Sequence, residues 1–329
     1  MNMSISHENC GVIACVGAGL VGCAWAVVFA KAGFRVSMHD SDASVLSAAS
    51  HRIRQQLGGL SDHGLLGEPA DDVADRVSIA ASLKDAVNGA IYIQESILER
   101  VDLKRELLTT LDSLDDGEVI VGSSTSGIPA SAFATGLRMS ERVLVVHPVN
   151  PPSLIPLVEL VPSPSTSDKT LAFARELMFA CGQSPITVRR EIDGFVLNRL
   201  QAVLLREAWA LVQDGVASVE DIDKTVRDGL GWRWSFMGPF ETIDLNAVGG
   251  VADYARRLGP LYQGIAASRV HTEAWDAELI AEVEAQRRKL LSQDQLRDRA
   301  HWRDLRLMAF ARHMQSVHEE DGTQAASSS

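Results

Sequence analysis

The chain has 329 residues, of which 46% are hydrophobic and 22% are charged, and its formal net charge is −12. This length predicts one large or two ordinary domains with a sizeable core. The negative charge argues against a nucleic-acid partner, which requires a basic face, and no apolar run approaches the roughly 20 residues of a membrane span.

The first predicted element is a short apolar run, Val12–Val16, which is typical of a buried parallel strand. The glycines Gly17, Gly19 and Gly22 follow it as G-x-G-x-x-G, and the small apolar residues 24–32 predict a helix directly afterwards. In a dinucleotide site these three glycines permit the tight turn, the approach of a pyrophosphate and close packing of helix on strand. The helix N-terminus would then face the pyrophosphate.

A second predicted strand, residues 34–38, leads to Asp40, about 20 residues beyond the glycine motif. An acid at this distance accepts hydrogen bonds from ribose hydroxyls and repels a 2′-phosphate. We therefore expect NAD rather than NADP. The alternative is an ordinary strand–turn–helix in which the glycines occur by chance.

Strands and helices continue to alternate to about residue 190. Further strands are predicted over residues 77–80, 90–93, 119–123, 142–146, 157–161 and 184–188. Helices are predicted over residues 43–57, 83–87 and 101–114, with a loop over 58–72. This alternation indicates an α/β fold, with a doubly wound, Rossmann-type, largely parallel sheet over residues 8–190.

The pattern becomes helical beyond residue 190. Residues 195–214 form one long apolar-periodic stretch, and Ser218 with Asp221 predicts a capped helix start. Residues 274–291 and 301–318 are also expected to be helical. We predict an all-helical C-terminal domain over residues 191–318 for substrate binding and dimerisation, followed by a disordered tail, 319–329.

Polar residues fall at predicted strand ends, where ligands bind in doubly wound sheets. Residues 123–126 form one such cluster, and His147 begins another. Glu159 lies inside an apolar strand, where a carboxylate needs a partner, and His147 lies twelve residues earlier. A carboxylate that orients an imidazole makes it a general base, and hydride transfer to NAD requires one. The alternative is a core histidine at a strand end.

Two further polar residues are ambiguous from sequence alone. Asn198, at the start of the long helix, is either a cap or a helix-packing amide. Arg233 lies between Trp232 and Trp234, and its guanidinium suits either a substrate carboxylate or an interdomain salt bridge.

The four cysteines are Cys10, Cys15, Cys23 and Cys181, and they form neither a C-x-x-C pair nor a metal-binding spacing with histidine. This usage is typical of a reducing compartment. The N-terminal segment has no basic region followed by an apolar one, so no signal peptide is expected. We expect a soluble cytoplasmic protein without a bound metal.

Several longer motifs resemble the 3-hydroxyacyl-CoA dehydrogenase superfamily, and most closely its L-gulonate 3-dehydrogenase and lambda-crystallin branch. They are GAGLVG, QESILERVDLKR, SSTSGIP, HPVNPPSLIPLVELVP, GFVLNRLQ and GLGWRWSFMGPFET. The resemblance runs from about Gly11 to His313.

This resemblance implies a role for each matching position. NAD would be held by Gly17, Gly19, Leu20, Val21, Gly22 and Asp40, with Glu99 and Lys104 nearby. His147 would be the base and Glu159 its partner. The reacting oxygen would be bound by Ser126 and Asn198, in a pocket shaped by Asn150. The family also implies a homodimer joined through the helical domain.

The substrate class follows from differences within the superfamily. Hydroxyacyl-CoA enzymes carry a lysine-containing helix after the second strand, whereas this chain has no lysine between Ser41 and Ser82. Arg233 occurs in the gulonate-like branch. The resemblance thus favours a free 3-hydroxy acid, with L-gulonate as the preferred substrate. The alternatives are carnitine, another short 3-hydroxy acid, a 3-hydroxyacyl-CoA, or a crystallin-like NAD-binding structural protein.

Overall fold

The computed structural model describes residues 11–115, 117–269 and 274–327 and divides into two compact units. The first unit contains the residues up to Arg199 together with those from His301 onward, and the second contains Leu200–Ala300. Cys10 and the N-terminal segment examined for a signal peptide lie outside the described residues.

The first unit is built on an eight-stranded sheet with the order β3-β2-β1-β4-β5-β6-β7-β8. The strands are β1 (Val12–Val16), β2 (Arg35–His39), β3 (Val77–Ile79), β4 (Ala90–Glu95), β5 (Ile120–Ser123), β6 (Val143–Pro148), β7 (Leu157–Pro162) and β8 (Ser184–Thr187). All neighbouring strands are parallel except β6 and β7, which are antiparallel. The predicted doubly wound, largely parallel sheet is confirmed.

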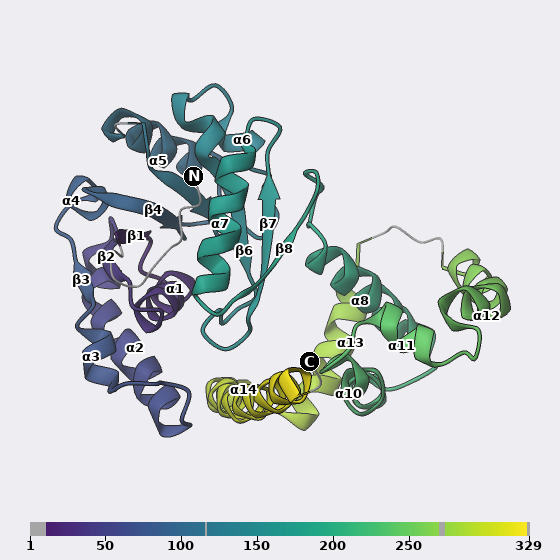
Figure 1. The fold of residues 1–329 in the computed structure, drawn as a ribbon. Helices are drawn as coiled ribbons and strands as arrows, with labels where there is room; N and C mark the ends of the chain where they lie inside the picture. The colour runs from purple at the N-terminus through teal and green to yellow at the C-terminus, as the bar shows by residue number, and fades with distance from the viewer. Residues whose placement is uncertain (1–10, 116, 270–273, 328–329) are drawn as a thin grey trace. The chain divides into compact units, whose positions relative to one another are not determined.

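Helices cover both faces of this sheet (Figure 1). They are α1 (Leu20–Lys31), α2 (Ala43–Asp62), α3 (Ala70–Ala74), α4 (Leu83–Val87), α5 (Val101–Leu114), α6 (Ser131–Ala134) and α7 (Asp168–Ala180). Alternate residues of β1 explain the two layers. Ile13 and Cys15 belong to the apolar cluster with α1, α2 and α7, whereas Ala14 and Val16 belong to the cluster with α5 and α6.

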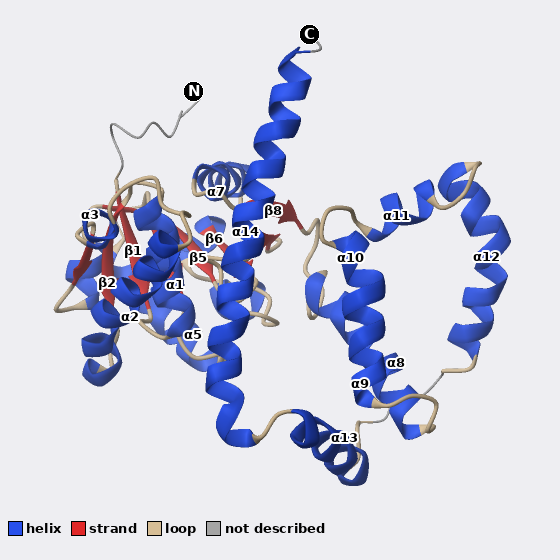
Figure 2. Cartoon of the chain, turned by 90° about the horizontal axis from the view of Figure 1, so that it is seen from below, coloured by secondary structure: helices blue, strands red, loops and turns tan. Residues whose placement is uncertain are grey.

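The second unit contains helices and loops, while the strands lie in the first unit (Figure 2). It holds most of α8 (Leu197–Gln213), then α9 (Val219–Lys224), the π-helix η3 (Thr225–Leu230), α10 (Gly231–Trp234), α11 (Pro239–Leu245), α12 (Gly250–Ala267) and α13 (Ala277–Leu290). Ser218 caps α9 by accepting a hydrogen bond from the Asp221 amide, as predicted. The predicted all-helical C-terminal region is confirmed.

Helix α2 continues through Gly58 and Gly59 to Asp62, where the sequence predicted a loop from residue 58. Glycine is a weak helix former, and tertiary packing overrides that preference here. The helix α14 (Leu296–Ser327) provides this packing, because its Met308 lies beside Gly59 and joins the core of the first unit. A Cβ atom on Gly59 would lie 3.1 Å from the Met308 Cε.

The division into units differs from a boundary at residue 190 in two ways. Residues 191–199 stay with the sheet, because the Glu159 carboxylate holds the amides of Val196 and Leu197. The residues from His301 onward belong to the first unit, since Met308 packs on α2. Helix α14 also continues to Ser327, across most of the segment for which composition predicted disorder. The assigned role of the helical domain stays a prediction.

No helix within the described ranges combines the length and apolar character that crossing a bilayer requires.

Candidate active site

The glycine turn between β1 and α1 has three glycines with different surroundings. Gly17 has a φ of +102°, and a Cβ there would lie 2.5 Å from the Ser96 carbonyl oxygen. A Cβ on Gly22 would lie 1.8 Å from the Gly17 carbonyl oxygen, so both positions exclude a side chain. Gly19 has no neighbouring atom within 4 Å of such a Cβ. Protein packing therefore leaves the Gly19 backbone open, as the approach of a pyrophosphate requires.

Asp40 lies against this turn, directly after β2. Its Oδ2 accepts a hydrogen bond from the Ala18 amide at 2.7 Å, and its Oδ1 accepts one from the Asp42 amide at 2.9 Å. Arg52 donates to the Ala18 carbonyl oxygen at 3.2 Å. The peptide groups on both sides of Ala18 are thus held, and the carboxylate expected to bind ribose has a fixed position.

His147 and Glu159 face each other across the antiparallel pair β6 and β7. The His147 Nδ1 lies 2.8 Å from the Glu159 Oε2, and the two residues are 6% and 0% exposed. The other oxygen, Oε1, accepts hydrogen bonds from the amides of Val196 at 2.8 Å and Leu197 at 3.0 Å. The predicted meeting of imidazole and carboxylate is present.

The protonation of this pair follows from its contacts. Burial alone would raise the pKa of Glu159, but hydrogen bonds from His147, Leu197 and Val196 outweigh it, so the pKa lies below its ordinary value. The carboxylate is therefore ionised at neutral pH and accepts only. Nδ1 of His147 must carry the hydrogen, which leaves the lone pair of the neutral ring on Nε2.

Phe195 completes this arrangement, and sequence reasoning missed it. Its ring lies 5.7 Å from the His147 ring, centroid to centroid, and the side chain is fully buried. Its φ is 51°, in the left-handed region, directly after Gly194 with a φ of 74°. This turn precedes the two amides that bind Glu159. The only sequence signal was a glycine–aromatic pair before a helix.

Ser126 and Asn198 lie together at the exposed edge of the first unit. The Asn198 side-chain amide donates to the Ser126 carbonyl oxygen at 2.7 Å. Glu99 joins them, because its Oε1 accepts hydrogen bonds from the amides of Ser126 at 2.8 Å and Gly127 at 3.2 Å. Residues predicted from three separate motifs thus form one cluster.

Lys104 is 1% exposed and lies beneath this cluster. Its ammonium donates to both oxygens of Glu95, at 2.8 and 2.9 Å, and lies 3.7 Å from Glu99. Two carboxylates therefore surround the charge that the resemblance placed near the cofactor. Glu95, 2% exposed, was missed, although an acid at the end of an apolar strand signals a buried pair.

Apart from Val21, which is partly buried against the core, the remaining predicted residues are exposed. Leu20 and Val21 begin α1, with Leu20 69% exposed. Asn150 follows β6, three positions after His147. Arg233 is on α10, in the second unit, between the exposed rings of Trp232 and Trp234. The cluster in the first unit does not include Arg233.

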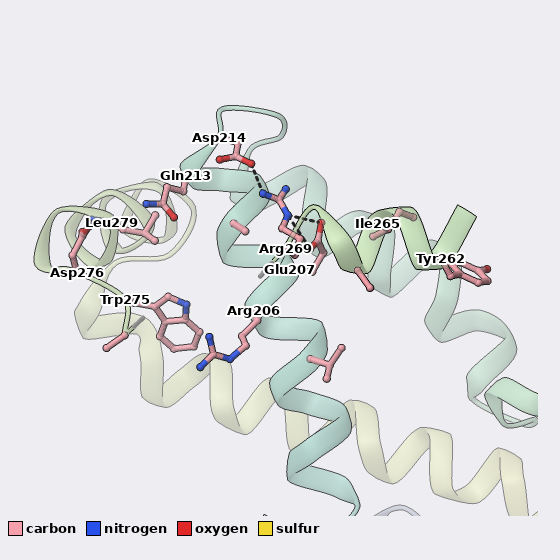
Figure 3. A pocket seen from close by; sticks show the side chains of 14 residues that line it. Arg206, Glu207, Gln213, Asp214, Tyr262, Ile265, Arg269, Trp275, Asp276 and Leu279 are labelled. Carbon is pink, nitrogen blue, oxygen red and sulfur yellow. Dashed lines mark hydrogen bonds and ion pairs between the residues drawn. The ribbon is translucent and has the colours of Figure 1, made fainter. Parts of the chain in front are cut away.

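The second unit has a pocket of about 810 Å³ between α8, α12 and α13 (Figure 3). Arg269 points into it and forms ion pairs with Glu207 at 3.2 Å and Asp214 at 2.5 Å. Trp275 also lines the pocket and stacks on Trp209, with ring centroids 4.3 Å apart. None of the residues predicted to carry chemistry lines this pocket.

Comparison with known families supports the assignment of both units. Residues 12–192 match the 3-hydroxyacyl-CoA dehydrogenase NAD binding domain, and residues 194–289 match the C-terminal domain of the same family. A solved 5-formyl-3-hydroxy-2-methylpyridine 4-carboxylic acid 5-dehydrogenase, an NAD⁺-dependent dismutase, is similar with a TM-score of 0.81 and 25% identity. The match covers 93% of this chain and 99% of that one.

Two curated relatives have higher identity. Lambda-crystallin from Oryctolagus cuniculus is 45% identical over 73% of this chain and 76% of its own length. L-carnitine dehydrogenase from Streptomyces coelicolor is 38% identical over 83% of this chain and 86% of its own length. The chain therefore belongs to the 3-hydroxyacyl-CoA dehydrogenase family, and it is an NAD-dependent oxidoreductase that acts on a CH–OH group.

Proposed function

We propose that this enzyme oxidises the 3-hydroxyl of a small 3-hydroxy acid, with L-gulonate, giving 3-dehydro-L-gulonate, as the favoured substrate. The observation that carries the proposal is the buried His147–Glu159 pair, 2.8 Å apart, in the same unit as the glycine turn. An ionised partner leaves Nε2 of the imidazole as the proton acceptor.

In this proposal His147 removes the hydroxyl proton at Nε2, while Ser126 and Asn198 hold the oxygen. The cofactor NAD⁺, when bound by the glycine turn and Asp40, supplies the hydride acceptor. Glu159 stays ionised throughout and stabilises the imidazolium that forms. In the reverse direction the same ring returns the proton to the oxygen.

The arginines after β2 argue against a CoA substrate. Residues 41–82 contain no lysine, and their arginines are Arg52, Arg54 and Arg76. Arg52 donates to the Ala18 carbonyl, Arg54 pairs with Asp71 and Asp75, and Arg76 pairs with Glu68. Because each of these cations already has a protein partner, the segment offers little to the phosphates of CoA.

Arg233 is the proposed partner of the substrate carboxylate. Arg233→Ala should weaken the binding of carboxylate substrates by about 1.5 to 3 kcal/mol, the range for a hydrogen bond to a charged group. Their KM should rise accordingly. Arg227→Ala is the matched control, because Arg227 is also an exposed arginine of the second unit and pairs with Asp228. An unchanged KM in Arg233→Ala would favour the salt-bridge role instead.

Carnitine is the second candidate, and the tryptophans beside Arg233 favour it. Trp232 is 71% exposed and Trp234 is 41% exposed, and aromatic faces attract a trimethylammonium group. The similarity to L-carnitine dehydrogenase supports the same candidate. Retained carnitine turnover in a double variant with both tryptophans changed to leucine would contradict this role for the rings.

A screen of NADH formation distinguishes the candidates. It should include L-gulonate, 3-hydroxybutyrate, carnitine and a 3-hydroxyacyl-CoA. Highest kcat/KM on gulonate supports the proposal, and preference for the CoA thioester contradicts it. Tight NAD binding without turnover of any hydroxy acid would favour a crystallin-like structural role.

We further propose that the enzyme is a cytoplasmic homodimer joined through the helical unit. The free thiols of Cys15 and Cys23, which are buried in the core, are typical of a reducing compartment. The helices of the second unit expose large apolar side chains, including Phe236, Phe240 and Leu245, which a second copy would cover.

A further inference from the structure

We propose that Glu99 is a positioning residue for the reacting oxygen, because it fixes the loop 125–127 and, through that loop, Asn198. This inference rests on the proposed function, in which Ser126 and Asn198 hold the substrate oxygen. The resemblance implied only that Glu99 lies near NAD. The contacts in this structure connect it to the substrate side as well.

One oxygen of Glu99 accepts four of the hydrogen bonds that hold the loop. Oε1 accepts from the Thr125 hydroxyl at 2.6 Å, from the Ser126 amide at 2.8 Å and from the Gly127 amide at 3.2 Å. The Ser126 hydroxyl also donates to it, at 3.3 Å. Four donors from three consecutive residues therefore converge on a single atom, and removing it would release the whole loop.

The buried ammonium of Lys104 stabilises the negative charge on Glu99. Its Oε2 lies 3.7 Å from the Lys104 ammonium, which is buried against both oxygens of Glu95. Burial alone would raise the pKa of Glu99, but the hydrogen bonds from Thr125, Ser126 and Gly127 and the Lys104 charge lower it overall. Glu99 is thus an anion that accepts hydrogen bonds and donates none.

The loop in turn fixes two groups that face the substrate. The Ser126 hydroxyl donates to Glu99 at 3.3 Å, and it must turn this hydrogen away from Glu99 to donate to the reacting oxygen, whose own hydrogen goes to His147. The Ser126 carbonyl can only accept, so Asn198 must present its NH₂ to it at 2.7 Å. This contact settles which end of the Asn198 amide is nitrogen and leaves its second hydrogen for the substrate oxygen.

The test compares Glu99→Ala and Glu99→Gln with Glu106→Gln, an exposed acid on the adjacent α5. Hydrogen exchange is measured on the peptide that covers residues 125–128, and NADH affinity is measured by fluorescence. Glu99→Ala should speed exchange at the amides of Ser126 and Gly127, and Glu106→Gln should not. Unchanged exchange would overturn the proposal whether or not the proposed substrate is correct.

Turnover of the substrate found in the screen supplies the second readout. Glu99→Gln keeps the size of the side chain but loses the charge, so kcat should fall about 10- to 100-fold. NADH affinity should fall by a smaller factor than kcat. A large loss of NADH affinity with kcat unchanged would assign Glu99 to the cofactor alone and overturn the proposal.

A double-mutant cycle separates positioning from a general loss of structure. If Glu99 acts partly through Asn198, the loss of kcat in the Glu99→Gln, Asn198→Ala double variant should be smaller than the product of the two single losses. Fully multiplicative losses would show that the two residues act independently and would contradict the proposal.

Discussion

The two units of this protein differ in how completely each buries its own side chains. The first unit buries Trp25, Phe29 and Tyr92 completely within a continuous core. In the second unit, the cluster of buried apolar residues that the structure describes consists of Val212, Val219 and Leu279. The first unit can therefore hold a rigid site by itself, whereas the second leaves large apolar side chains such as Phe240 and Leu245 exposed.

The hydrogen bonds and ion pairs of the two units also differ in how deeply they are buried. In the first unit, both oxygens of Glu159 have partners, and the carboxylate is fully buried. In the second unit, ion pairs such as Arg227–Asp228 are more than half exposed and contribute little to stability. A substitution at Glu159 should therefore lower the free energy of unfolding far more than a substitution at Arg227 or Asp228.

The largest expected effect is on His147. His147→Ala removes the proton acceptor, so turnover should fall about 10²- to 10⁴-fold, the usual contribution of a general base. NADH affinity should stay near that of the wild type, because the ring lies outside the glycine turn. Initial rates and NADH fluorescence measure the two effects, and unchanged turnover would refute the assignment of the base.

Glu159→Gln tests whether the carboxylate controls the imidazole. An amide nitrogen facing Nδ1 would move the ring hydrogen to Nε2 and remove the proton acceptor, so turnover should fall within the same range as for His147→Ala. The His147→Ala, Glu159→Gln double variant should be no slower than His147→Ala alone. A further large loss in the double variant would mean that Glu159 acts independently of the ring.

The same pair predicts a dependence of stability on pH. Because the folded pKa of Glu159 is lowered, its ionised form stabilises the fold above the unfolded value of about 4.3. That stabilisation is lost as the pH falls through the folded pKa. Denaturant titrations should show a difference in unfolding free energy between wild type and Glu159→Gln that is greatest near pH 7 and shrinks below about pH 4. A difference that grows on acidification would contradict this.

Asp40→Ala should have a smaller effect, confined to the cofactor. Loss of the ribose contact, and of the acceptor for the Ala18 amide, should weaken NAD binding by about 10- to 100-fold and relax discrimination against NADP. Asp62→Ala, at the far end of α2, is a matched control. Calorimetric titration with both cofactors measures the change, and strict NAD preference in Asp40→Ala would argue against the ribose role.

The smallest effect on catalysis is expected for Phe240, in the second unit. Phe240→Asp places a charge on a side chain that is 79% exposed, so it should weaken self-association at least about tenfold by burying an unpaired charge at the interface. Phe179→Asp, at a 53% exposed position of the first unit, is the control. Sedimentation velocity measures both, and a monomeric wild-type protein would rule out the proposed homodimer.

Local patterns predicted the first unit well. The bounds of α4 and α5 agree with those predicted, and the separation of twelve positions between His147 and Glu159 does match adjacent strands. These features depend on periodicity and spacing within one segment. The fold and the pairing of His147 with Glu159 could therefore be predicted from the sequence alone.

Contacts between distant segments could not be predicted in this way. The helical state of Gly59 depends on Met308, nearly 250 positions away. The left-handed Phe195 is a backbone state that an aromatic residue rarely adopts. Tertiary packing decides each of these, and no window of sequence contains it.

The carboxylate of Glu159 touches both the imidazole and the first amides of α8, and this has a consequence for protein engineering. Exchanging the segment 194–198 to alter substrate preference would also disturb the two backbone amides that donate hydrogen bonds to that carboxylate. A redesign at the start of this helix would thereby also change the contact that orients the His147 ring, and the two properties would have to be selected together.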